Sequence, residues 1–189
     1  MLVKQNMVIK HEKYNLSMII SGGQTGADRA ALDFALSVGM ACSGWCPKGR
    51  LSEDKYVPLR YPLIEANSNL YQHRTRLNVR DSCATLIFLS EKSSGGTILT
   101  IRCCIAQRKP HFIFSIGNDG QVDSEEKLKA WLYKTSPKVL NVAGPRASES
   151  RNIYDFVFRV LSSVLAASER SEEPIWPPQR PKTRNLNFK

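Results

Sequence analysis

The hydrophobic positions along the chain follow two alternating patterns. Short runs that are apolar at nearly every residue predict strands, and they are clearest at residues 18–20, 85–89, 112–116 and 139–143. Apolar residues spaced three and four apart predict helices at residues 31–38 and 153–165, with weaker patterns at residues 69–82, 98–107 and 124–133. Strands that alternate with helices are typical of α/β domains.

The strand pattern also constrains the sheet. Strands that are apolar on nearly every residue must be covered on both faces, and parallel strands joined by right-handed helical crossovers meet that need. The sequence therefore predicts an α/β fold of the Rossmann-like, doubly wound type, with a mainly parallel sheet and helices on both faces.

Three segments are expected along the chain. Residues 1–17 are predicted to be a flexible N-terminal segment, residues 18–167 a single ligand-binding domain, and residues 168–189 a disordered or extended Pro-rich basic tail with four prolines. Within the domain, residues 41–63 are rich in Gly and Pro and predict a long irregular loop with one short strand. Loops of that length in a compact domain are often functional.

Composition narrows the class of protein. The 189 residues contain no apolar run of the roughly 20 residues that a membrane helix needs and no apolar leader, so a cytoplasmic protein is expected. The five cysteines and three histidines lack the spacing of zinc or redox motifs, which predicts reduced thiols and no intrinsic metal site. The net charge is +10, and the central domain holds most of it, which favours an anionic partner.

The strongest local signal is a glycine-rich loop between the first strand and the first helix. Its candidate ligand-binding residues are Gly22, Gly23, Gln24, Thr25, Gly26 and Arg29. Glycines let a backbone approach an anion closely, and a helix N-terminus offers unpaired N–H groups and about half a positive charge. The loop is neither GxxxxGK[ST] nor an intact GxGxxG. It predicts a phosphate site, and the alternative is a tight turn with Asp28 capping the helix.

Two further loops follow later strands. The first contributes Ser94, Gly95, Gly96 and Thr97, and the second is Gly144-Pro145-Arg146, with Arg146 as the candidate contact. The carboxyl ends of parallel strands meet at one edge of a sheet, where ligands of doubly wound folds bind. We therefore expect the three loops to share one crevice.

Other candidates lie in the long loop and after it. Trp45 offers a face for stacking on a purine or pterin, and Lys48 or Arg50 can neutralise a phosphate, although a core tryptophan beside solvated charges is equally consistent. Glu53, Asp54, Asp28 and Asp81 are the candidate carboxylates for catalysis. An arginine–aspartate pair near Asp81 is more often structural than catalytic.

Five segments in this order resemble the family called putative molybdenum carriers. They are residues 21–29, 44–54, 78–82, 94–97 and 140–146, and the resemblance runs from about Met18 to Ala167. It implies a protein that binds molybdenum cofactor, a phosphorylated pterin, or a related nucleotide. It also implies a homo-oligomer, either a dimer or a tetramer.

The wider superfamily that the resemblance implies includes Lonely-guy-type phosphoribohydrolases and DNA-processing proteins that bind single strands. The hydrolases carry PGGxGTxxE with a catalytic Glu, whereas this chain has Thr100 at that position and lacks the first Pro. The departure argues against hydrolysis and leaves phosphate binding by Thr97 intact.

Three functions remain open at this point. The first is a binding or carrier protein for a phosphorylated nucleotide-like or pterin ligand. The second is an enzyme that cleaves an N-glycosidic or phosphate ester bond of a nucleoside monophosphate. The third is single-stranded nucleic-acid binding, which the positive charge and the tail residues Trp176, Arg180, Lys182 and Arg184 suggest.

Overall fold

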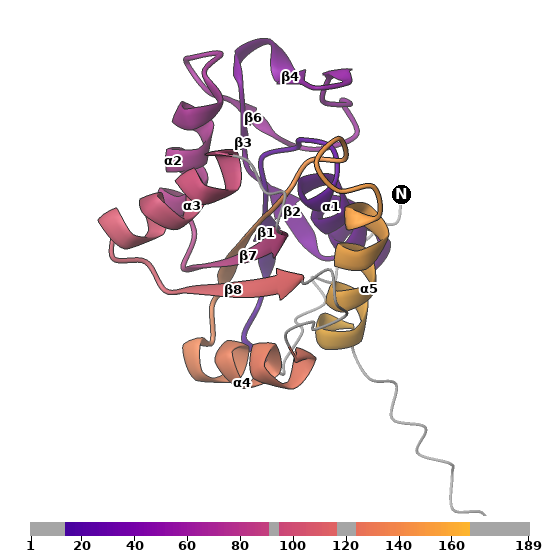
Figure 1. The fold of residues 1–189 in the computed structure, drawn as a ribbon, viewed down its shortest axis with the longest axis vertical. Coiled ribbons are helices and arrows are strands. Elements are labelled where there is room, and N and C mark those ends of the chain that lie inside the picture. The colour runs from indigo at the N-terminus through magenta and orange to yellow at the C-terminus, as the bar shows by residue number, and fades with distance from the viewer. Residues whose placement is uncertain (1–13, 91–94, 117–123, 167–189) are drawn as a thin grey trace, which may run out of the picture.

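A five-stranded parallel sheet forms the centre of the protein (Figure 1). The computed structural model describes residues 14–90, 95–116 and 124–166. The strands stand in the order β2-β1-β9-β7-β8, and every neighbouring pair is parallel. Their bounds are β1 (Met18–Ile20), β2 (Ala41–Ser43), β7 (Ala84–Ser90), β8 (His111–Ile116) and β9 (Val139–Ala143).

Helices cover both faces of this sheet, so the predicted doubly wound α/β fold is confirmed. Their bounds are α1 (Ala27–Ser37), α2 (Tyr71–Asp81), α3 (Gly95–Ala106), α4 (Glu125–Thr135) and α5 (Ile153–Leu165). Helix α5 packs against α1 and α4 on one side, while α2 and α3 pack against each other on the opposite side (Figure 1).

Strand β7 shows why the central strands are apolar at every residue. Leu86 and Phe88 belong to the main core, which also contains the buried faces of α1, α4 and α5. Ile87, between them in sequence, packs with Val79 of α2 and with the cysteines of α3 in a second, smaller core. Successive side chains of a strand point to opposite faces, and here each face meets a helix layer.

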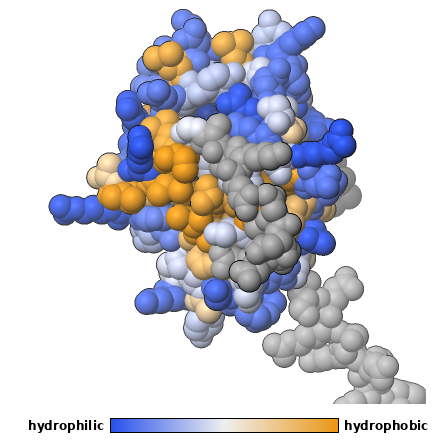
Figure 2. Space-filling model, in the orientation of Figure 1, coloured by the Kyte–Doolittle hydropathy of each residue, from blue (hydrophilic) through white to orange (hydrophobic). Residues whose placement is uncertain are grey.

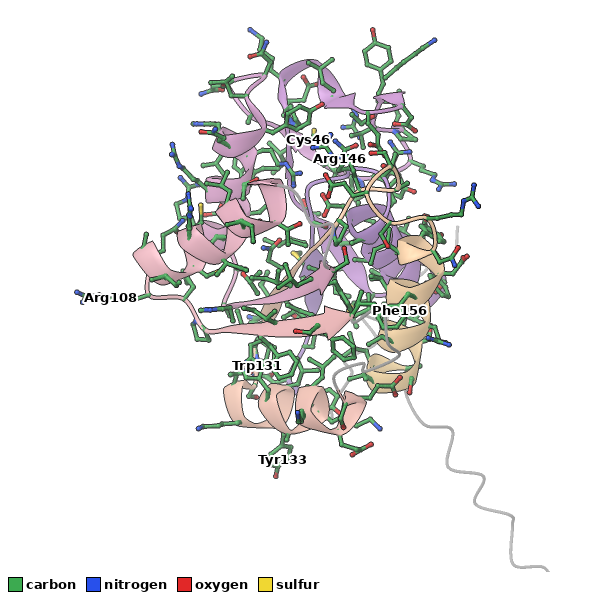
Figure 3. All side chains as sticks on the ribbon, in the orientation of Figure 1. Cys46, Arg108, Trp131, Tyr133, Arg146 and Phe156 are labelled. Atoms are coloured by element: carbon green, nitrogen blue, oxygen red, sulfur yellow. The ribbon has the colours of Figure 1, made fainter. Side chains whose placement is uncertain are left out.

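Aromatic contacts fix α4 and α5 on the main core. The Trp131 ring lies 5.6 Å from that of Phe112 on β8, and the Phe156 ring lies 6.0 Å from that of Phe114. Figure 3 shows Trp131 pointing from α4 toward the sheet and Tyr133 pointing away from it. The edge of α4 that carries Trp131 is therefore the one that buries apolar surface.

The strand order matches that of a known class of sheets when the count starts at β9. Taking β9 as the first strand and continuing through β1, β2, β7 and β8 gives the sheet order 3-2-1-4-5. That is the order of the first five strands of doubly wound nucleotide-binding sheets, whose ligands lie between strands 1 and 4. In this chain those two strands are β9 and β7.

The segment between β2 and α2 is more ordered than expected. It contains β3 (Trp45–Cys46), the 3₁₀ helix η2 (Lys48–Arg50), β4 (Leu51–Ser52), β5 (Lys55–Tyr56) and β6 (Ile64–Glu65). The prediction of an irregular loop with one short strand from residue 41 was wrong. The prediction missed β2 and most of the other short strands, because strands of two or three residues are too short to show a hydrophobic period.

The N-terminal boundary also needs correction. Tyr14 and Leu16 are almost fully buried in the main core, and the Ser17 backbone N–H donates to the Lys138 carbonyl at 3.0 Å. Residues 14–17 therefore belong to the packed domain, because apolar side chains ahead of β1 add to its core. The predictions for residues 1–13 and 168–189 lie outside the described residues. In the part that is described, no helix is long and apolar enough to cross a membrane.

Candidate functional site

A pocket of about 350 Å³ opens at the carboxyl edge of the sheet. It is lined by residues of the loops that follow β1 and β9 and by the N-terminus of α3, and it extends between α2 and α3 on one face. Its lining residues are Gln24, Asp28, Tyr71, Gln72, Arg74, Thr75, Gly95, Gly96, Thr97, Leu99, Thr100, Arg102, Ala143, Gly144, Arg146 and Glu149. The pocket thus lies beside β9 and β7, where the sheet order reverses and where such folds hold ligands.

The N-terminus of α3 faces this pocket. Gly95, Gly96 and Thr97 form its first turn and line the cavity, and a Cβ atom added at Gly95 would meet nothing within 4 Å. The N-terminus of a helix carries a partial positive charge and attracts anions. Ser94, the remaining predicted contact of this loop, lies outside the described residues.

A buried ion pair lines the pocket. Arg74 Nη1 is 3.1 Å from Asp28 Oδ2, and the two side chains are 14% and 4% exposed. The same carboxylate oxygen accepts the backbone N–H of Gln24 at 3.2 Å. Burial raises the pKa of Asp28 above its ordinary value, and the charge of Arg74 and the Gln24 N–H oppose that rise. The predicted catalytic candidate Asp28 is therefore in the pocket, held by an arginine from α2.

Gly22 makes room for that arginine. A Cβ atom at this position would lie 1.5 Å from Arg74 Nη1 and 2.3 Å from its Cζ. The glycine that sequence reasoning assigned to a bound anion thus accommodates a guanidinium of the protein itself.

Two other arginines line the pocket. Arg146 follows β9 (Figure 3), and its Nε donates to Glu149 Oε1 at 2.8 Å. Arg102 extends from α3 and is exposed. With Arg74 and the two carboxylates, the lining carries one net positive charge when all five groups are ionised.

Besides Arg74 and Arg102, the α2–α3 end of the pocket has uncharged side chains. Tyr71, 41% exposed, and Gln72 come from the first turn of α2, and Leu99 comes from the facing side of α3. This end offers an aromatic face and an amide, the kind of surface that holds a flat heterocycle.

The loop after β1 is largely occupied with internal contacts. The Gln24 side-chain oxygen accepts the backbone N–H groups of Thr25 and Glu53, at 3.0 and 2.9 Å. Thr25 in turn bonds to Glu53 and accepts the Ala147 N–H. These contacts join the loops after β1 and β9 to residues 44–70 between β2 and α2, called the inserted segment below.

Glu53 is the centre of that junction. Ser148 Oγ donates to Glu53 Oε2 at 2.6 Å. Partial burial alone would raise the pKa of Glu53, but the hydrogen bonds from Ser148 and Thr25 outweigh it and lower the pKa. Glu53 is therefore held as a carboxylate that joins loops.

Arg29 fastens the same segment from the other side. Its Nη2 donates to Asp54 Oδ1 at 2.7 Å and its Nε to the Gly23 carbonyl at 3.2 Å. The hydrogen bonds from Arg29 lower the pKa of Asp54 to about 2. A Cβ atom at Gly23 would lie 2.6 Å from Leu63, so this glycine also serves internal packing.

Several sequence candidates lie outside the pocket lining. Trp45 donates through its indole N–H to Asp81 at 2.7 Å, and Asp81 also pairs with Arg80. Arg50 donates to four backbone carbonyls of the inserted segment, and Lys48 is exposed in η2. The structure therefore does not bring Trp45, Lys48, Arg50 or Asp81 together with Asp28.

Sequence reasoning missed part of the lining. Tyr71, Gln72, Arg74 and Arg102 lie on helices whose apolar stripes are weak, and single-sequence patterns do not reveal which of their faces meets a cavity. One signal for this part of the lining was available in the sequence. Helix α2 must cover a sheet, yet it carries three arginines and an exposed tyrosine, which is unusual for a purely structural helix.

The parallel sheet and its reversed strand order define a Rossmann-like α/β fold in which the strands follow one another along the chain in a permuted order. The family comparison agrees with that arrangement. Residues 19–165 match the family described as "Circularly permutated YpsA SLOG family", and the chain belongs to this family. The permutation is visible in the sheet, because the strands follow the usual order 3-2-1-4-5 only when the count starts at β9.

A solved structure is also similar to this chain. It is described as a putative molybdenum carrier protein from Syntrophus aciditrophicus SB, with 41% identity and a TM-score of 0.73, covering 80% of this chain and 96% of that one. The predicted family is confirmed. Comparison with curated proteins finds no match.

Proposed function

We propose that the protein binds a small phosphorylated ligand with a flat heterocycle, a nucleotide or a pterin, in the pocket beside β7 and β9. The observation that carries the proposal is the convergence of the loops after β1 and β9 and the N-terminus of α3 on one cavity. The phosphate would lie at the first turn of α3 near Gly144 and Arg146. The heterocycle would lie against Tyr71.

The size and charge of the pocket favour a monophosphate. A volume of about 350 Å³ is at the small end of ligand pockets, which range from about 300 to 1,000 Å³. One net positive charge plus about half a charge from the helix balances a phosphate monoester, which carries about −1.5 to −2 at pH 7. A triphosphate would bring uncompensated charge into the same space.

Molybdenum cofactor is a candidate of this class, since the similar solved protein is named a molybdenum carrier. The lining residues suit the phosphate and the ring of a pterin. They include no cysteine or histidine, and no three metal-binding side chains cluster within the described residues. If this cofactor is the cargo, Gly95, Gly96, Arg146 and Tyr71 would hold its organic part.

Calorimetric titration of the purified protein tests the proposal. AMP, GMP and ribose 5-phosphate are expected to bind, with AMP at least tenfold tighter than ATP. Tyr71→Ala should cost AMP about tenfold in affinity, because stacking on an aromatic side chain contributes about 1–3 kcal/mol per base. The same variant should leave ribose 5-phosphate unchanged.

Tyr133→Ala is the matched control, since Tyr133 is an exposed tyrosine on α4, away from the pocket. Equal affinity for AMP and ATP would contradict the monophosphate assignment. A wild-type protein that binds none of these compounds would contradict the proposal as a whole.

A further inference from the structure

Arg74 is an arginine with one edge unused. Among the described residues its Nη1 alone has a hydrogen-bond partner, the carboxylate of Asp28. Its Nε is buried and has none. Leaving a buried donor without a partner is destabilising, so such a group in a native protein needs an explanation.

Two other arginines, Arg50 and Arg29, have purely structural roles and differ from Arg74 in their hydrogen bonds. Arg50 donates from Nε, Nη1 and Nη2 to four backbone carbonyls at 3.0 to 3.2 Å. Arg29 likewise has a partner for each nitrogen, from the Gly23 carbonyl to Asp54. Arg74 differs from both because Nε and Nη2, which form one edge of the guanidinium, are left over.

That edge has a specific chemistry. The N–H bonds of Nε and Nη2 point the same way and match two oxygens of a phosphate or carboxylate. The side chain lines the same pocket as the first turn of α3. Asp28, almost fully buried on α1, holds the opposite end of the guanidinium, and Gly22 lets it lie against the loop after β1.

We propose that Arg74 binds the phosphate of the ligand through its Nε–Nη2 edge and that Asp28 is its positioning residue. The inference rests on the proposed function and adds to it the side chain that recognises the phosphate. It also gives Asp28 a role other than catalysis. The bound phosphate would supply the hydrogen-bond partner that Arg74 Nε lacks.

Arg74→Lys is the first test, because lysine keeps the charge and loses the two-pronged edge. Inorganic phosphate and ribose 5-phosphate are titrated into each variant by calorimetry. The variant should bind both at least tenfold more weakly than wild type, while its affinity for adenosine, which has no phosphate, stays within twofold. Arg80→Lys, on the same helix but outside the pocket lining, should bind all three like wild type.

Asp28→Asn tests the positioning role. Its effect on phosphate affinity should approach that of Arg74→Lys, and the double variant should be no weaker than Arg74→Lys alone, because Asp28 acts through Arg74. Asp33→Asn, on the same helix and bonded to Tyr61 and Tyr154, is the control. Thermal unfolding establishes that each variant is folded, and Arg74→Lys decides the question if Asp28→Asn is not.

The outcomes separate the two proposals. Phosphate binding that is lost in Arg74→Lys supports the assignment even if no nucleotide binds. Wild-type-like phosphate affinity in Arg74→Lys overturns it while nucleotide binding in wild type leaves the proposed function standing. Equal losses for adenosine and ribose 5-phosphate in Arg74→Lys also overturn it, because they indicate a collapsed pocket in place of a lost phosphate contact. Failure of wild type to bind inorganic phosphate and ribose 5-phosphate overturns the assignment of Arg74, and failure to bind AMP and GMP as well overturns both proposals.

Discussion

The glycines around the pocket divide into those that serve the fold and one that leaves space. Gly22 accommodates Arg74, and Gly26, with a φ of 76°, lies so close to the Pro145 carbonyl that a Cβ would be 2.6 Å from it. Gly95 meets nothing. Glycine therefore meets a different requirement at each of these three positions, and only the surroundings of each position distinguish them.

This division predicts opposite outcomes for two alanine substitutions. Gly22→Ala should lower the free energy of unfolding by about 1–3 kcal/mol, as overpacking does, and weaken phosphate binding because Arg74 is displaced. Gly95→Ala should fold with wild-type stability, because its Cβ points into open space. Urea unfolding and phosphate titration of both variants measure this. A Gly22→Ala variant with wild-type stability and affinity would show that Arg74 is free to lie elsewhere.

At the scale of elements, the inserted segment holds the loops at the carboxyl edge of the sheet in place. Its β4–β5 turn carries Glu53 and Asp54, which bind the loop after β9 and the first helix respectively. Neither contact lines the pocket, yet both fix loops that do. The insertion therefore contributes to the site by holding its walls.

The Arg29–Asp54 ion pair makes the stability contributed by this segment dependent on pH. The pKa of Asp54 is about 2 in the folded protein against an ordinary 3.8, so the unfolded chain takes up a proton first as pH falls. The contribution to stability is complete above pH 3.8 and is lost as pH falls toward 2. Because Asp54 is 45% exposed, its size should be modest, below about 1 kcal/mol.

Urea unfolding of wild type and Asp54→Asn at several pH values measures that contribution. At pH 7 the variant should be the less stable, and the difference should shrink between pH 4 and pH 2. A difference that stays constant over this range would mean that the carboxylate charge is not what Arg29 binds.

At the scale of the whole molecule, the sequence was sufficient for the layers and insufficient for the site. Strands such as β7 and β9 are recognisable because every residue meets a helix layer. The pairing of Asp28 with Arg74, 46 residues apart, has no local signature. It depends on how α2 lies across the sheet, and α2 contacts the short strand β3 of the inserted segment.

The predicted self-association remains a proposal, and the surface suggests where it would occur. Ile98 and Ile105 of α3 are 37% and 63% exposed, and Figure 2 shows apolar side chains gathered over this helix and the neighbouring edge of the sheet. We expect light scattering to give at least twice the 21.3 kDa chain mass. Ile105→Glu should reduce the mass to that of one chain with an unchanged circular dichroism spectrum, whereas a wild-type monomer at micromolar concentration would contradict the proposal.

The last prediction concerns chemistry: the protein should bind nucleoside monophosphates without splitting them. Cleavage of the N-glycosidic bond needs a carboxylate to stabilise an oxocarbenium-like sugar and activate water. The position where the hydrolases carry Glu is Thr100, which is buried and donates its hydroxyl to the Gly96 carbonyl at 3.2 Å. The two carboxylates of the described lining, Asp28 and Glu149, are each paired with an arginine. Base release from AMP and GMP should therefore stay near background, because general base assistance typically contributes about a hundred- to ten-thousand-fold. Turnover that disappears in Glu149→Gln while AMP still binds would instead identify an enzyme and name its carboxylate.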